Sequence, residues 1–228
     1  MTGDLKRAAR GLAAVVALSA FAAQAAGDGR LLAMEAAEPI DHVVIGLQRT
    51  AVPLFAGFAL DTSLLGNIAL APNLGVRWGS KLGDHAGLAL GVRYTLFVGT
   101  DLYSQFIQGQ QPLVKRFDPS FSGPSAYAAF GYDLGAITLS AEARYSHFYY
   151  DAAGVNAAVQ WHLSEKWAVV GEIGVHILGP PPIHAALGIR FTGDNFGFSL
   201  GAAYVGIDDP LLPSIPILPA IDLSWSFT

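Results

Sequence analysis

The sequence of 228 residues contains no cysteine and little charge, and each shortage excludes a class of protein. Without cysteine no disulfide can form, so a disulfide-stabilised secreted scaffold is excluded. Lysine and arginine total 13 against 18 acidic residues, and they are scattered along the chain, so the basic patch of a nucleic-acid-binding protein is missing. A hydrophobic content of 52% excludes an intrinsically disordered chain.

Long apolar runs are also missing after the N-terminal region. A membrane-spanning helix needs about 20 apolar residues, and no such run occurs after Ala26. The N-terminus itself has three basic residues, an apolar stretch from Gly11 to Phe21, and the small-x-small sequence Ala23-Gln24-Ala25. This order predicts that residues 1–25 are a secretory signal peptide, because the apolar core is too short for a membrane anchor.

The rest of the chain alternates large apolar residues with small or polar ones at a period of two, which is typical of β-strands. Residues 86–98 show it well, since Leu88, Leu90 and Val92 alternate with glycine, alanine and arginine. The pattern predicts ten strands, at residues 51–59, 66–78, 86–98, 123–133, 136–149, 153–163, 167–178, 183–192, 195–206 and 218–227.

The composition of the two strand faces favours a barrel that faces lipid. A soluble sheet exposes many lysines and glutamates, whereas here one face is large and apolar and the other carries Gly, Ala, Ser, Thr and Asn with isolated charges. Short turns alternate with longer links, of which Gly99 to Ser122 is the longest. The predicted fold is an all-β, transmembrane, antiparallel up-and-down barrel of about ten strands, with eight or twelve as alternatives. The predicted domains are a signal peptide (1–25), a periplasmic lead-in (26–50) and the barrel (51–228).

The last strand reads Ile221-Asp-Leu-Ser-Trp-Ser-Phe227-Thr. Together with the signal peptide and the alternating strands, it resembles the small bacterial outer-membrane β-barrels of the OmpA/OmpX-like kind. The resemblance implies a Gram-negative outer-membrane location, contact with outer-membrane lipid, and assembly by the barrel-assembly machinery through the C-terminal strand. Members typically end in an aromatic residue, whereas here Phe227 is penultimate and Thr228 is last.

Charged residues on the small-residue face are predicted to line the barrel lumen. They are Arg77, Arg93, Glu142, Arg144, Glu172, His176, His184, Arg190 and Asp222. Two interpretations are open: the charges form a salt-bridged plug, because buried charges usually pair, or they line a narrow selective pore. Glu172 and Arg190 are expected to be neighbours in one hairpin. His176 and His184 are expected to lie close together, but two histidines are too few for a zinc site.

The sequence favours a non-enzymatic, porin-like outer-membrane barrel with a structural, surface-interaction or narrow-pore role. No cofactor or metal is predicted, and the partner is a small solute or a surface molecule that binds the Gly99 to Ser122 link. One alternative is a barrel enzyme acting on envelope lipid or peptide. His147 resembles the histidine of outer-membrane deacylases, but Tyr149 stands where they have a nucleophilic serine. The other alternative is a secreted soluble barrel that binds a lipid-like ligand, with Arg93, Glu142 and Arg144 outside.

Overall fold

The computed structural model describes residues 31–96 except 33, 38, 69 and 70, residues 122–179 except 149, residues 183–205 except 194, and residues 217–227. The predicted signal peptide, Tyr149 and all of the Gly99 to Ser122 link except Ser122 lie outside these residues. Within the described part of the chain, no helix combines the length and the apolar character needed to cross a membrane.

Twelve strands and one short helix make up the described fold. Three short strands come first: β1 (Val43–Gly46), β2 (Thr50–Pro53) and β3 (Phe58–Thr62). The helix α2 (Leu64–Ile68) follows. Nine longer strands complete the chain: β4 (Asn73–Leu82), β5 (Ala86–Thr95), β6 (Gly123–Asp133), β7 (Ile137–Phe148), β8 (Tyr150–His162), β9 (Trp167–Leu178), β10 (Ile183–Thr192), β11 (Phe196–Val205) and β12 (Ile217–Phe227).

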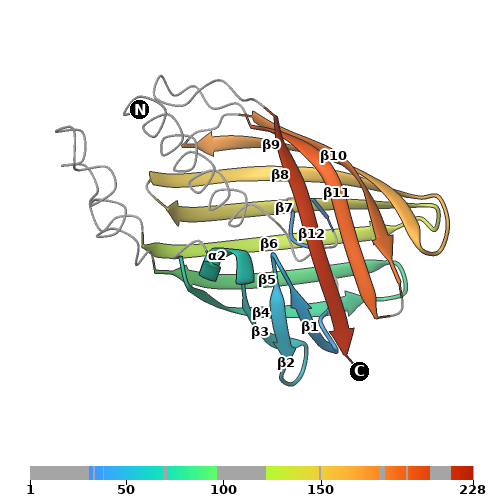
Figure 1. Cartoon of the computed structure of the whole chain (residues 1–228), viewed down its shortest axis with the longest axis horizontal. Coiled ribbons are helices and arrows are strands. Elements are labelled where there is room, and N and C mark those ends of the chain that lie inside the picture. The colour runs from blue at the N-terminus through green and yellow to red at the C-terminus, as the bar shows by residue number, and fades with distance from the viewer. Residues whose placement is uncertain are drawn as a thin grey trace, which may run out of the picture.

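The strands form one closed barrel in which each strand pairs antiparallel with its neighbours in the sequence. The first and last strands close it, with Val43 opposite Phe227 and Gly46 opposite Ser224. Figure 1 shows the short strands β1–β3 at one side of the wall and the long strands around the rest. The predicted up-and-down topology is therefore confirmed, with twelve strands in place of about ten.

The prediction of a single strand at residues 51–59 is wrong, because the chain turns back in the middle of it. β2 ends at Pro53, and a tight turn follows in which Ala56 and Gly57 have φ angles of 48° and 81°. The Leu54 amide donates to Phe58 O at 2.8 Å, which closes the turn into a hairpin. Positive φ angles at two successive residues suit such a tight reversal, so β2 and β3 replace one predicted strand.

The predicted strand at 66–78 also begins too early, because α2 occupies its first residues. The Gly66 amide donates to Ser63 Oγ at 3.1 Å, and the Asn67 amide donates to Ser63 O at 3.0 Å, so Ser63 caps the helix. The Asn73 side chain in turn accepts from the Ser63 amide at 2.8 Å. Strand β4 therefore starts at Asn73 and runs on to Leu82.

The barrel begins earlier than the predicted boundary at residue 51. β1 lies inside the range 26–50 that was expected to be a periplasmic lead-in, and it is the strand that pairs with β12. The residues before β1 are not outside the barrel wall either, since Leu31, Met34, Glu35 and Ile40 are buried. The lead-in is thus corrected to an internal segment followed by the first strand.

The two faces of the wall differ sharply in exposure. Along β5, Val92 is 60% exposed, whereas Ala89 and Thr95, three positions away on either side, are buried. On β10, Leu187 is 65% exposed while Ala186 and Arg190 are buried. Because successive strand residues point to opposite faces, the large apolar residues lie on the outside of the barrel and the small and charged residues lie on the inside.

Candidate functional site: the occupied lumen

The structure places the nine predicted lumen residues on the inward side of the wall. Five of them are buried, namely Arg77, Glu142, Glu172, Arg190 and Asp222. The other four, Arg93, Arg144, His176 and His184, are partly buried. The soluble alternative required Arg93, Glu142 and Arg144 on the outside, so this arrangement contradicts it.

A segment of the chain fills the space that these residues surround. Residues 31–40, apart from 33 and 38, are called the inner segment here. Met34 is fully buried and Glu35 is only 2% exposed. The segment ends where Asp41, which is exposed, contacts His42 Nδ1 at 2.6 Å just before β1. This hydrogen bond to His42 lowers the pKa of Asp41. Sequence reasoning did not foresee a segment inside the lumen.

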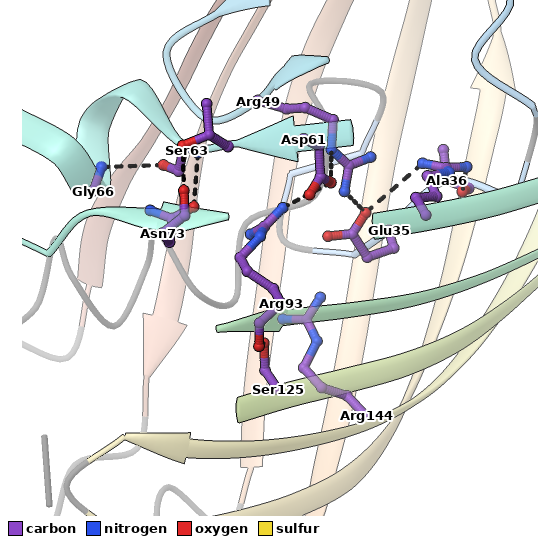
Figure 2. Close-up of polar contacts among 12 residues, drawn as sticks. Glu35, Ala36, Arg49, Asp61, Ser63, Gly66, Asn73, Arg93, Ser125 and Arg144 are labelled. Atoms are coloured by element: carbon purple, nitrogen blue, oxygen red, sulfur yellow. Dashed lines mark hydrogen bonds and ion pairs between the residues drawn. The ribbon is translucent and has the colours of Figure 1, made fainter. Parts of the chain in front are cut away.

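Three arginines and two carboxylates form a buried network at one side of the lumen (Figure 2). Asp61 Oδ2 lies 3.0 Å from Arg49 Nε and 3.0 Å from Arg93 Nη2. Arg49 also pairs with Glu35 of the inner segment, and Arg77 Nη1 lies 3.9 Å from the same carboxylate. The side chains of Arg49, Asp61, Glu35 and Arg77 are at most 3% exposed. Such buried charges need partners, and here the wall and the inner segment share them.

Sequence reasoning missed Glu35, Arg49 and Asp61. Asp61 alternates with the apolar residues of β3 as the other inward charges do, but the predicted strand stopped at residue 59. Arg49 lies in the connection just before β2, and Glu35 lies in the predicted lead-in. Correct placement of the short strands would have identified Asp61, whereas the sequence carried no periodic signal for Glu35.

Other wall residues contact the backbone of the inner segment. The Leu32 amide donates to Glu172 Oε1, and the Glu35 amide donates to Glu142 Oε2 at 2.6 Å. Arg77 Nη2 donates to Ala36 O. These three contacts satisfy main-chain groups that burial would otherwise leave without partners.

A buried apolar cluster lies on the part of the lumen formed by the later strands. The side chains of Leu31, Leu32 and Met34 form one buried cluster with wall residues from the later strands. The buried wall members are Ala158, Val170 and Ala186, and Ala203 and Ala220 pack against them. All five wall residues are small or medium in size, so β8–β12 leave space for the larger side chains of the inner segment.

Glu142 on β7 contacts Arg144 on the same strand and Asn156 on β8. Arg144 Nε lies 2.9 Å from Glu142 Oε1, and Asn156 Nδ2 donates to that oxygen at 2.7 Å. His176 on β9 and His184 on the adjacent strand β10 lie close together as expected, with ring centroids 5.5 Å apart. Within the described residues, no group of three or more metal-ligating side chains occurs.

The expected pairing of Glu172 with Arg190 is wrong in register. Glu172 lies opposite Ala186, while Arg190 lies opposite Ala168. The first pair of the hairpin is Ile183 with Val175, because the last residues of β9 extend past β10 and pair with β8 instead. The two charges are therefore four positions apart along the hairpin.

A polar group at the rim bears on the enzyme alternative. His147 Nδ1 lies 2.8 Å from Asp151 Oδ1, and the Tyr145 hydroxyl donates to the same oxygen at 2.6 Å. A carboxylate can orient a histidine base in this way. The third member here is a tyrosine hydroxyl, which binds the carboxylate and not the histidine, so these three residues do not form a nucleophile–base–carboxylate chain.

Comparisons with known proteins identify no family for this chain. No family model matches the chain, and no curated protein matches it. Among solved structures it is similar to that of the NanC porin in a rhombohedral crystal form, with 9% identity and a TM-score of 0.48 over 82% of this chain and 96% of that one.

Proposed function

We propose that the protein is a non-enzymatic outer-membrane β-barrel whose narrow pore is closed by its own inner segment. Its location is supported by the outer surface. The outward positions of β9–β12 carry no acidic or basic residue, and Ile173, Leu187, Leu200 and Ile221 are between 47% and 65% exposed there. Such a surface is costly in water and suits lipid.

The occupied lumen is the observation that carries the pore proposal. Glu35 enters the arginine network, while Leu31, Leu32 and Met34 fill the apolar part of the same space. The segment belongs to no strand, and it is joined to β1 by only two residues. A segment held by side-chain contacts and a few main-chain contacts can leave without unpairing the wall, so its release opens the lumen to small solutes.

Single-channel conductance tests this proposal. The mature chain, residues 26–228, is refolded and inserted into planar bilayers, and the Leu32→Ala/Glu35→Gln variant is compared with it. We expect rare openings from the unaltered chain and frequent openings from the variant, because the variant loses apolar and ionic contacts of the inner segment. Val92→Ala, which changes only the exposed outer face, should behave as the unaltered chain.

Two outcomes decide against the pore. If both chains insert and neither conducts, the barrel has a structural role and the charges form a permanent salt-bridged plug. If both conduct equally, the inner segment does not close the lumen. Refolding is checked by the heat-dependent gel mobility of a folded barrel, so a silent, unfolded variant is recognised.

A further inference from the structure

We infer that the lumen is a binding site for a short peptide with an acidic side chain, and that the inner segment is its resident occupant. This inference rests on the proposed function, because it names the class of solute that the opened lumen would accept. The evidence for it is the set of inner-segment groups that the wall contacts: main-chain groups, one carboxylate and several apolar side chains.

The main-chain contacts would recognise the backbone of a peptide and not its side chains. Glu172 and Glu142 accept from the amides of Leu32 and Glu35, and Arg77 donates to a carbonyl of the same segment. Two carboxyl acceptors and one guanidinium donor are thus directed at peptide groups. A fatty acid has no N–H groups, so it would leave the two buried carboxyl groups without these donors.

The wall also selects for a negative charge. Its buried and partly buried ionic groups among the described residues are five arginines and four carboxylates: Arg49, Arg77, Arg93, Arg144 and Arg190, with Asp61, Glu142, Glu172 and Asp222. Glu35 of the inner segment pairs with Arg49 among them. A peptide that replaced the inner segment would need an acidic side chain at the same place to pair with this buried arginine.

Apolar side chains next to the acidic residue complete the recognition. Leu31, Leu32 and Met34 lie against Ala158, Val170 and Ala186 on three successive strands. A Cβ atom added at Gly188 would come 2.6 Å from Leu200 O and 3.0 Å from Leu32 Cδ1, so the glycine lets both the next strand and the leucine approach. The inner segment thus presents Leu31, Leu32 and Met34 to an apolar cluster and Glu35 to the arginine network.

The covalent link to β1 makes the inner segment a strong competitor. A tethered ligand has an effective concentration in the millimolar range, so a free peptide binds only when the tethered segment is weakened. The test therefore uses the full mature chain with Leu32→Ala/Glu35→Gln, and Glu35→Gln alone if the double variant does not refold.

The probe is a fluorescent synthetic peptide with the sequence of residues 31–40, followed by anisotropy in detergent. We expect saturable binding to the variant and at least tenfold weaker binding to the unaltered chain. A peptide with glutamine in place of its residue-35 glutamate should bind about tenfold more weakly, since a charged hydrogen-bonded contact is lost. N-methylation of the peptide nitrogens of residues 32 and 35 should have at least that effect. A peptide of scrambled sequence serves as the matched control.

The contribution of the wall is tested with Arg77→Gln, which should weaken peptide binding about tenfold. Val92→Ala, on the outer face, should not change peptide binding. Equal binding of the scrambled, N-methylated and native-sequence peptides overturns the inference. So does saturable binding of decanoate without binding of the peptide, which would show that the lumen takes an amphipathic carboxylate instead. Peptide binding by a barrel that never conducts would leave this site standing and overturn the pore, and conduction without peptide binding would do the reverse.

Discussion

Asp61 on β3 reaches Arg93 on β5 across an intervening strand, and their side chains meet at 3.0 Å. The residue between them in the same row of the sheet is Gly75, which lies opposite Asp61 on one side and opposite Arg93 on the other. The ion pair therefore occupies the space that a side chain at position 75 would fill. This relationship leads to the first prediction.

Gly75→Ala should destabilise the barrel by about 1–3 kcal/mol. An added Cβ would overlap Asp61 Oδ1 and would lie 3.0 Å from Val92 O, so both the carboxylate and the backbone would have to move. Urea unfolding of the refolded protein, followed by tryptophan fluorescence, measures the change. The matched control is Gly171→Ala, where the nearest atom is 3.9 Å away. Equal effects at the two glycines would show that the lumen is less crowded than described.

Asp61→Asn should cost about 3–5 kcal/mol of unfolding free energy, because it removes one partner from a buried ionic network. Arg49 and Arg93 both lie 3.0 Å from the Asp61 carboxylate. Combining Asp61→Asn with Arg93→Met should cost less than the sum of the single changes, and the same urea titration tests this. Asp41→Asn, at an exposed residue, should change stability by less than about 0.5 kcal/mol. Strict additivity of the first pair would contradict the proposed contact.

The absence of native cysteine allows the inner segment to be probed by single-cysteine labelling. Ala36 is buried, whereas Asp41 is exposed. Ala36→Cys should therefore react with a membrane-impermeant maleimide at least about tenfold more slowly than Asp41→Cys, because reaction requires transient exposure. Adding Glu35→Gln to Ala36→Cys should accelerate labelling. If Ala36→Cys reacts as fast as Asp41→Cys in the unaltered background, the segment does not reside in the lumen.

Leu187→Arg should hinder folding into lipid vesicles by about 2–4 kcal/mol, the cost of an arginine at the lipid face near the bilayer centre. Leu187 is 65% exposed on the outer face of β10. Leu187→Ala is the control, since it removes the side chain without adding charge. A barrel that tolerates the arginine in lipid as well as the alanine would contradict the outer-membrane location.

The inward charges could be predicted from the sequence because a period of two fixes which residues share a face. Arg77, Arg93 and Glu142 all lie in long strands where many successive positions repeat the pattern. Strands of four or five residues, such as β1 and β2, contain too few repeats to define a face or an end. That is why the count fell two strands short.

The inner segment could not be predicted for a different reason. Its contacts are non-local: Leu32 meets Glu172, and Glu35 meets Glu142, more than one hundred residues away in the sequence. Nothing in the local pattern of residues 31–40 signals burial, because the lumen exists only after the whole wall has formed. The register of Glu172 and Arg190 failed for a related reason, since the end of β9 pairs with β8 beyond the point where β10 begins.

The four residue pairs between β1 and β12 have a consequence for the order of assembly. They join the two ends of the described chain, so the contact of greatest sequence separation is the one that seals the wall. Contacts of this kind carry the largest loop-closure entropy and form late. The inner segment immediately precedes β1, and it is therefore enclosed at that final step. A chain without residues 224–227 would lose all four of these pairs, and its sheet would keep two open edges beside the segment.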